Sequence, residues 1–264
     1  MRTVNIFGTE AGQVGKTTLA CHVAWRALSS SLRPVVLDAD DKHRAADGAS
    51  ALVNALPEHD VVWLGTGPTQ EVLDEDPDAG WQHWDKVRRV LDKRDVILDL
   101  GANTVQRFLE YAAHMRAGTR WREDGITTTV WVPTNSDSAH IDSAVRTANA
   151  AATVFGADAV RVVLNRRDGG FEVFDTSPQG KCLAALKSAG IQLFTIPKAK
   201  IPPLGLAALK RGPRSAHQVA AWSISEAADQ LGLDRLIAER TKFGCEDWIA
   251  AIDKNLEGLL PPKS

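Results

Sequence analysis

Short apolar runs rich in β-branched residues alternate along the chain with longer stretches in which apolar residues recur at helical spacing. The runs within 3–7, 35–41, 61–64, 95–103, 127–132, 160–167 and 192–196 predict strands. Helices are predicted between and after them, at 16–28, 45–56, 81–91, 136–155, 181–189, 215–231 and 233–240. This alternation predicts an α/β fold: a doubly wound, mostly parallel sheet with helices on both faces. No internal repeat or long linker divides the sequence, so residues 1–264 are predicted to form a single domain.

The last segment, 246–264, has the pattern of an amphipathic C-terminal helix. Its apolar positions fall near one helical stripe: Trp248, Ile249, Ile252, Leu256 and Leu259. A helix that uses such a stripe to bind a membrane carries Lys and Arg on its polar face. Here the charged positions are mostly acidic: Glu246, Asp247, Asp253 and Glu257, with Lys254. We therefore expect this helix to dock onto the core or onto a partner protein rather than onto a membrane.

The composition narrows the class of protein. A formal net charge of −2 excludes a globally basic, histone-like design but leaves local basic patches open. The three cysteines, Cys21, Cys182 and Cys245, are scattered and match no metal-binding spacing, which indicates reduced thiols. No apolar run approaches the ~18 residues of a membrane-spanning helix, and the first residues show no signal-segment pattern. We expect a cytoplasmic protein.

The strongest chemical signal lies where the first predicted strand ends. The chain breaks at Gly8, loops to Gly15 and enters a predicted helix at Lys16. In such a loop, unpaired backbone N–H groups and the positive end of the helix bind an anion. The Gly-Lys-Thr at the helix start adds a lysine for the β- and γ-phosphates and the Thr17 hydroxyl for Mg²⁺. The sequence therefore predicts a nucleotide-binding loop in which Lys16 acts in catalysis.

The spacing of this loop differs from the common phosphate-binding loop, because Glu10 stands where Gly-x4-Gly-Lys-Ser/Thr requires glycine. The segment from Ala11 to Thr18 instead resembles the deviant Walker A loop of ParA/MinD-type ATPases. The match is at Gly12, Gly15, Lys16, Thr17 and Thr18. The chain departs from the family at Ala11, where the family has a second lysine, and at Gln13. The resemblance implies a set of residues that bind ATP or ADP: Gly12, Gln13, Val14, Gly15, Lys16, Thr17 and Thr18.

Two more predicted strands end in carboxylates, at the edge where parallel sheets bind ligands. Asp38 and Asp40 follow the second apolar run, and Asp99 follows the fourth. The first pair is similar to the Asp-x-Asp of the ParA/MinD family, which implies that Asp40 positions the attacking water and Asp38 supports the Mg²⁺ shell. Asp99 has the place of a Walker B carboxylate and, with Thr17, is expected to hold Mg²⁺. A solvated acidic loop is the alternative interpretation of Asp38 and Asp40.

Asn165 and Pro197 are the candidates for contact with the base. The amide of Asn165 offers both a donor and an acceptor to a purine edge, although an Asn that ends a strand at a turn is equally compatible. Both positions are similar to the family, in which a strand-end Asn and the loop after Ile-Pro lie along the base. The run from Asn165 to Asp168 loosely approximates the guanine motif Asn-Lys-x-Asp, so GTP stays an alternative to ATP.

The resemblance spans most of the chain and implies a function. It implies an ATP- and Mg²⁺-dependent ATPase in plasmid or DNA partition, stability, conjugation or positioning, which forms a homodimer across its nucleotide. In the family, the lysine that is missing at Ala11 crosses to the partner's nucleotide. Slow hydrolysis is therefore expected, unless Lys42, Arg44 or Lys198 replaces it. The alternative is a nucleotide-gated binding module that barely hydrolyses and recruits a protein or DNA partner.

Segment 107–122 is the candidate for nucleic-acid contact. It places four arginines around Tyr111 and Trp121: Arg107, Arg116, Arg120 and Arg122. Basic residues interleaved with aromatic ones suit phosphates and bases. A charged, solvated helix face is the commoner explanation. DNA, or a DNA-binding adaptor protein, is therefore a candidate partner.

Overall fold

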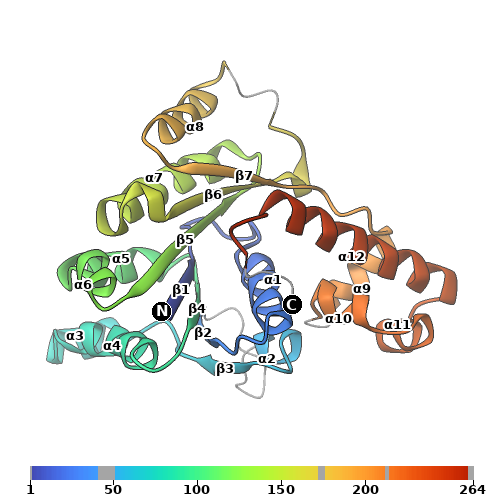
Figure 1. Ribbon diagram of the computed structural model, residues 1–264, viewed down its shortest axis with the longest axis horizontal. Helices are drawn as coiled ribbons and strands as arrows, with labels where there is room; N and C mark the ends of the chain where they lie inside the picture. Colours follow the sequence, from blue (N-terminus) through green and yellow to red (C-terminus); the bar gives the residue numbers. More distant parts are fainter. Residues whose placement is uncertain (1, 41–50, 172–175, 212–213, 261–264) are drawn as a thin grey trace.

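The computed structural model describes residues 2–40, 51–171, 176–211 and 214–260, and within them seven strands form one sheet (Figure 1). The strands are β1 (Arg2–Phe7), β2 (Val35–Ala39), β3 (Asp60–Trp63), β4 (Val96–Leu100), β5 (Ile126–Thr134), β6 (Val160–Asn165) and β7 (Gln192–Ile196). Their order is β3-β2-β4-β1-β5-β6-β7, and every pairing is parallel. The predicted doubly wound α/β fold is confirmed. Because the strands run in parallel, their carboxyl ends meet at one edge of the sheet.

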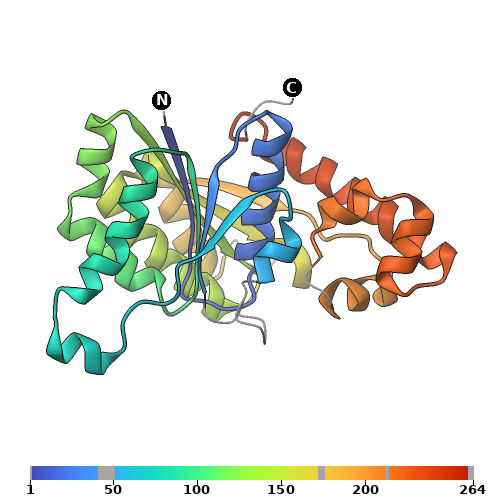
Figure 2. The same ribbon diagram turned by 90° about the horizontal axis from the view of Figure 1, so that it is seen from below.

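Helices cover both faces of this sheet. One face carries α4 (Ala79–Leu91), α5 (Val105–His114), α6 (Ala117–Glu123), α7 (Ser138–Phe155) and α8 (Pro178–Ser188), with α3 (Gln70–Glu75) beside α4. The other face carries α1 (Lys16–Ser29), α2 (Ala51–Ala55), α9 (Pro203–Arg211), α10 (Ala216–Ala221), α11 (Ile224–Leu231) and α12 (Arg235–Asn255). In both views α1 lies between the sheet and the C-terminal helices α9–α12 (Figures 1 and 2).

The alternation of side chains along the strands divides the core between the two faces. Val4 and Ile6 of β1 are buried with α4–α8, whereas Phe7 is buried on the α1 side. There Phe7 stacks on Trp131 of β5, with ring centroids 6.0 Å apart. Each fully buried side chain of this size contributes about 1.5–3 kcal/mol. This packing fixes the end of β1, and with it the start of the phosphate-binding loop.

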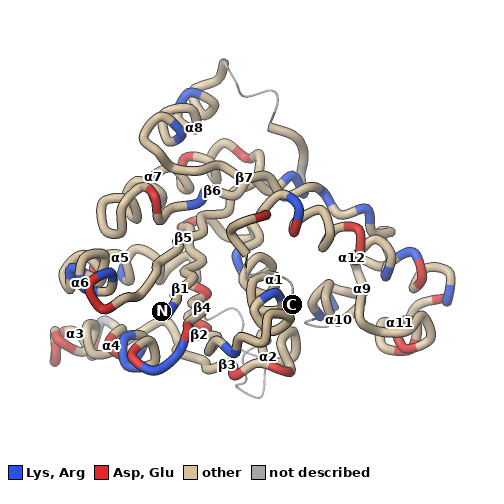
Figure 3. The backbone as a smooth tube through the Cα atoms, in the orientation of Figure 1, with Lys and Arg blue, Asp and Glu red and all other residues tan. Residues whose placement is uncertain are grey.

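The C-terminal helix differs from its prediction. One continuous helix, α12, runs from Arg235 to Asn255, where the sequence predicted a helix at 233–240 and another within 246–264. Gly244 lies inside α12, next to the backbone of Lys200. A Cβ at this position would come within 2.7 Å of the Lys200 carbonyl oxygen, so this close packing requires glycine. Ile252 and Leu256 are buried against the α1 side of the sheet, and the apolar stripe docks onto the core. Figure 3 shows acidic and basic residues interspersed along α12.

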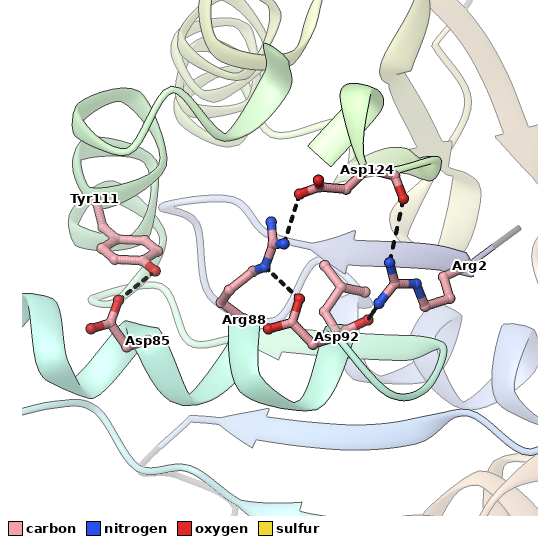
Figure 4. Close-up of polar contacts among 7 residues, drawn as sticks. Arg2, Asp85, Arg88, Asp92, Tyr111 and Asp124 are labelled. Atoms are coloured by element: carbon pink, nitrogen blue, oxygen red, sulfur yellow. Dashed lines mark hydrogen bonds and ion pairs between the residues drawn. The ribbon is translucent and has the colours of Figure 1, made fainter. Parts of the chain in front are cut away.

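The candidate nucleic-acid segment forms α5 and α6, and its aromatic residues belong to the core. Tyr111 and Trp121 are 2% and 3% exposed. The Tyr111 hydroxyl donates to Asp85 of α4 at 2.9 Å, and Arg88 of the same helix pairs with Asp124 (Figure 4). Burial, together with the Asp85 carboxylate, raises the pKa of Tyr111. Neither aromatic ring is available to stack on a base.

None of the helices in the described part of the chain is long and apolar enough to cross a membrane.

Candidate functional site

The loop between β1 and α1 contains two residues in the left-handed backbone conformation. Gly15, which precedes the first turn of α1, has φ +100°, a left-handed conformation that favours glycine. A Cβ there would also lie 2.7 Å from Nδ2 of Asn165, so the strand-end residue of β6 closes directly over the loop. Gln13 has φ +58°, which places two left-handed residues in one short turn. Such a turn directs successive backbone N–H groups inward and forms an anion-binding concavity.

Lys16 begins α1 and folds back over this loop. Its Nζ donates to the carbonyl oxygen of Ala11 at 2.8 Å, and the side chain is only 6% exposed. A buried ammonium needs a polar partner, and here the backbone of the loop provides one. This contact holds the ammonium group at the loop, from where it can exchange its hydrogen bond to Ala11 for one to a phosphate oxygen.

Three carboxylates gather at the ends of β2 and β4. Asp38 and Asp99 are register partners in the β2–β4 pairing, and both are fully buried. Asp99 Oδ2 accepts the Thr17 hydroxyl at 2.7 Å, and Asp38 Oδ1 accepts the backbone N–H of Asp40 at 3.0 Å. Gly101 lets the chain after β4 lie close to Asp40, because a Cβ at Gly101 would lie 3.1 Å from Asp40 Cγ.

This donor set fits Mg²⁺ bound together with a nucleotide. Within the described ranges no group of three His, Cys, Asp or Glu side chains could hold a metal ion alone. Mg²⁺ prefers one or two protein oxygens and completes its shell with water and phosphate oxygens. The Thr17 hydroxyl and the Asp99 carboxylate supply that number of oxygens.

A cavity of about 470 Å³, the phosphate cavity, lies against these residues. Seven predicted site residues line it: Gly12, Gln13, Gly15, Lys16, Thr17, Thr18 and Asp40. Its remaining lining residues are Ala102, Arg167 and Lys210. The loop, the start of α1 and the residue that follows β2 therefore meet around one space.

The other predicted residues lie behind or beside this space. Val14 is buried, and its carbonyl oxygen accepts Nδ2 of Asn165 at 3.0 Å. The Asn165 Oδ1 accepts the backbone N–H of Arg167, so both ends of this amide are engaged. The Pro197 carbonyl oxygen accepts the indole N–H of Trp248 at 2.8 Å. Contact of Asn165 and Pro197 with a base stays a prediction.

Two cations in the phosphate cavity were missed by the sequence reasoning. Arg167 follows β6 in the short helix η3 (Arg166–Asp168), and Lys210 stands near the end of α9. Of the predicted replacement cations, Lys42 and Arg44 lie outside the described residues, and Lys198 is exposed and does not line the cavity. Position just after a strand end was a usable signal for Arg167. Lys210 had none, because only tertiary packing brings α9 to the loop.

Glu10 has a structural partner on the far side of the loop. Its carboxylate pairs with the guanidinium of Arg146 on α7 at 2.8 Å. Both side chains are partly exposed, so the pair adds at most about 1 kcal/mol. It tethers the outer part of the loop at the position where the common motif has glycine.

Comparison with known proteins gives structural neighbours of low identity. No family model and no curated protein matches the sequence. The septum site-determining protein MinD of Pyrococcus horikoshii with Mg-ADP is 15% identical, with 98% of this chain and 96% of that chain covered and a TM-score of 0.47. McdA of Cyanothece complexed with ATP is 15% identical (95% and 96% covered, TM-score 0.47), and a plasmid partition protein of Borrelia burgdorferi is 12% identical (74% and 88%, 0.44). These values are too low to carry any conclusion about activity, and the fold class rests on the strand order itself.

Proposed function

We propose that this chain binds ATP and Mg²⁺ in the phosphate cavity and hydrolyses the nucleotide slowly. The observation that supports this most is the loop at the start of α1, where Lys16, Thr17 and Thr18 line the cavity. Backbone N–H groups and the helix dipole favour an anion there. The buried Asp99 beside the Thr17 hydroxyl completes the pairing that a Mg²⁺–nucleotide complex needs.

Each polar residue of the site then has a task. Bound Mg²⁺ would neutralise charge that develops on the phosphate oxygens. Lys16 would exchange the Ala11 carbonyl for the β- and γ-phosphates. Asp40, which lines the cavity and is held by Asp38, would orient the attacking water.

Ala11 sets the expected rate. In the family that the loop resembles, a lysine at this position neutralises transition-state charge on the partner's nucleotide. By analogy with arginine fingers, loss of such a cation costs ~10³–10⁵ in rate. Arg167 and Lys210 place positive charge in the cavity from the same chain and would recover part of this loss.

The cellular role follows from the sequence resemblance. We infer a nucleotide-dependent homodimer in the cytoplasm that acts in partition, stability or positioning of plasmid or other DNA. Because Tyr111 and Trp121 are buried, contact with DNA would use arginine side chains or a DNA-binding adaptor protein.

Calorimetry with ATP and Mg²⁺, combined with light scattering and a turnover assay, tests the proposal. We expect Mg²⁺-dependent binding, slow turnover, and roughly 100-fold weaker binding in Lys16→Ala, since one charge-assisted contact contributes about 1.5–3 kcal/mol. Arg146→Ala, which removes the surface tether of Glu10, is the matched control and should bind nearly normally. A protein that ignores both ATP and GTP at millimolar concentration would overturn the proposal.

The second candidate is a nucleotide-gated binding module. Ala11 favours it, because a chain without the crossing lysine can bind nucleotide and dimerise without appreciable turnover. Tight binding of ATP with no release of phosphate over hours would select the module.

A further inference from the structure

A second cavity adjoins the phosphate cavity. This space of about 240 Å³, the helix cavity, lies among α1, α2, α9, α10 and α12. It shares Thr17, Thr18 and Lys210 with the phosphate cavity. A ligand held at the start of α1 can therefore extend from one space into the other.

The two spaces differ in chemistry. Apolar and aromatic side chains make up much of the helix cavity: Leu52, Ala55, Leu209, His217 and Trp248. Its charged residues are the cations Lys210 and Arg214, and no carboxylate occurs among the described residues that line it. The phosphate cavity, in contrast, is lined mostly by polar and charged groups and by glycines. An anionic tail suits the phosphate cavity, and a flat, weakly polar body suits the helix cavity.

The aromatic walls are held in place before any ligand arrives. His217 shares a hydrogen bond of 3.0 Å with His22, whose other ring nitrogen lies 3.1 Å from Asp253 of α12. Trp25 stacks on His217 with centroids 5.7 Å apart and an interplanar angle of 9°. Burial, and next the charge of His22, lowers the pKa of His217 to about 3, so its ring is neutral near neutral pH. Trp248 is anchored through its bond to the Pro197 carbonyl.

We propose that one nucleotide spans both spaces, with its phosphates on the loop and its base in the helix cavity between α1, α10 and α12. This inference rests on the proposed nucleotide binding and names the part of the chain that binds the base. It departs from the sequence prediction for Asn165. In the structure that side chain supports the loop through the Val14 carbonyl, and it lines neither space.

The test compares affinities for ATP and inorganic tripolyphosphate, each with Mg²⁺. Tripolyphosphate reports the phosphate cavity alone, and the ratio of the ATP and tripolyphosphate affinities reports the base. In the wild type we expect ATP to bind at least roughly tenfold tighter than tripolyphosphate, the lower part of the range for a base stacked on aromatic rings. Ala216→Trp fills the helix cavity from a position on α10 that is not fully buried. It should lower ATP affinity to the tripolyphosphate level and leave tripolyphosphate binding unchanged.

Three further variants make the outcome unambiguous. Ala221→Trp, at an exposed position of the same helix, is the matched control and should behave as wild type. Leu209→Ala removes apolar wall without adding bulk and should weaken ATP alone by about threefold to tenfold. Asn165→Ala should weaken ATP and tripolyphosphate equally, because it disturbs the loop.

Failure of the inference and failure of the proposed function look different. A wild type that binds neither ATP nor tripolyphosphate removes the proposed function. A wild type that binds both equally, or an Ala216→Trp protein that keeps normal tripolyphosphate and ATP affinities, overturns the base position and leaves the phosphate site standing. Loss of ATP binding alone in Asn165→Ala would also overturn it.

Discussion

The carboxyl edge of the sheet has an acidic half and a basic half. On the β2–β4 side of β1, Asp38 and Asp99 are buried on regular strands, and Asp40 follows β2. On the β6–β7 side, the charged groups that line the phosphate cavity are Arg167 and Lys210, which stand on a short helix and a helix end. Lys16 lies between the two halves. The acidic half suits a metal ion and a water, and the basic half suits an anionic tail.

The two halves also differ in how deeply their charged side chains are buried. Asp99 and Asp38 already have hydrogen-bond donors in Thr17 and the Asp40 backbone, which fixes the oxygen positions. Arg167 and Lys210 are both exposed, and their long side chains reach the phosphate cavity from a short helix and a helix end. Under the proposed function, the strand ends would position the metal ion and the water, and the exposed cations would neutralise phosphate charge.

The largest expected effect concerns the acidic half. Asp99→Asn should weaken Mg²⁺-dependent binding and turnover roughly 10- to 100-fold, the range for groups that orient a bound metal. The same change removes one of two buried like charges in register, so the free energy of unfolding should rise by up to about 1 kcal/mol. Titration with Mg²⁺ and thermal denaturation check the two effects. Asp60→Asn, at a surface ion pair with Arg94, is the control, and equal loss in both variants would refute the assignment.

The next effect tests the missing lysine. Ala11→Lys should raise turnover by at least roughly tenfold, because a cation at this position can reach transition-state charge. Affinity for ATP should change little, since Lys16 contacts the backbone of residue 11 and not its side chain. Ala11→Met, of similar length and no charge, separates charge from bulk. An unchanged rate in Ala11→Lys would mean that another cation already fills this role.

The basic half should respond more weakly. Lys210→Ala removes an exposed cation that lines both cavities and should weaken ATP binding about three- to tenfold. Lys198→Ala removes an exposed lysine that lines neither and should have no effect. Calorimetry on both variants measures the difference. Equal affinities would place the basic half outside the site.

The smallest effect is on pH dependence. The pKa values of His217 and His83 are lowered to about 3 and about 4, in each case chiefly by burial. The unfolded chain, with His near 6.5, binds more protons than the folded one below that pH, so stability falls as pH drops from about 6.5 toward 4. His217→Gln should reduce this slope by at most about 1.4 kcal/mol per pH unit. Denaturant titrations at several pH values measure it, and an unchanged slope would show that His217 is protonated in the folded protein.

The sequence predicted those parts of the molecule that depend on neighbours along the chain. The strands follow from local apolar runs, and the phosphate loop follows from Gly15, Lys16 and Thr17 in a strand–loop–helix order. The carboxylates were found for the same reason, since each ends a predicted strand. Their common position at one edge follows from the parallel sheet, and Asp40 lines the phosphate cavity there.

What the sequence could not predict depends on packing between distant segments. Gly244 lies in the middle of α12, where the lack of a Cβ leaves room for the Lys200 carbonyl, and no local pattern encodes this contact. The approach of Lys210 to the loop depends on how α9 packs against α11 and α12. Tyr111 is buried, and its hydroxyl donates to Asp85 on α4. The sequence pattern, which offered Tyr111 for contact with nucleic acid, contained no sign of this distant partner.

The bond from Lys16 to the Ala11 carbonyl has a consequence for how this loop can vary. Every amino acid presents the same carbonyl, so residue 11 affects the resting position of the ammonium only through the fit of its own side chain, which for Ala11 is a buried methyl group. Under the proposed function, a substitution that fits at residue 11 would change the rate of nucleotide hydrolysis while the loop between β1 and α1 keeps its shape. Under the proposed function, variants with slow and with fast nucleotide hydrolysis would share the same structure of the unliganded loop.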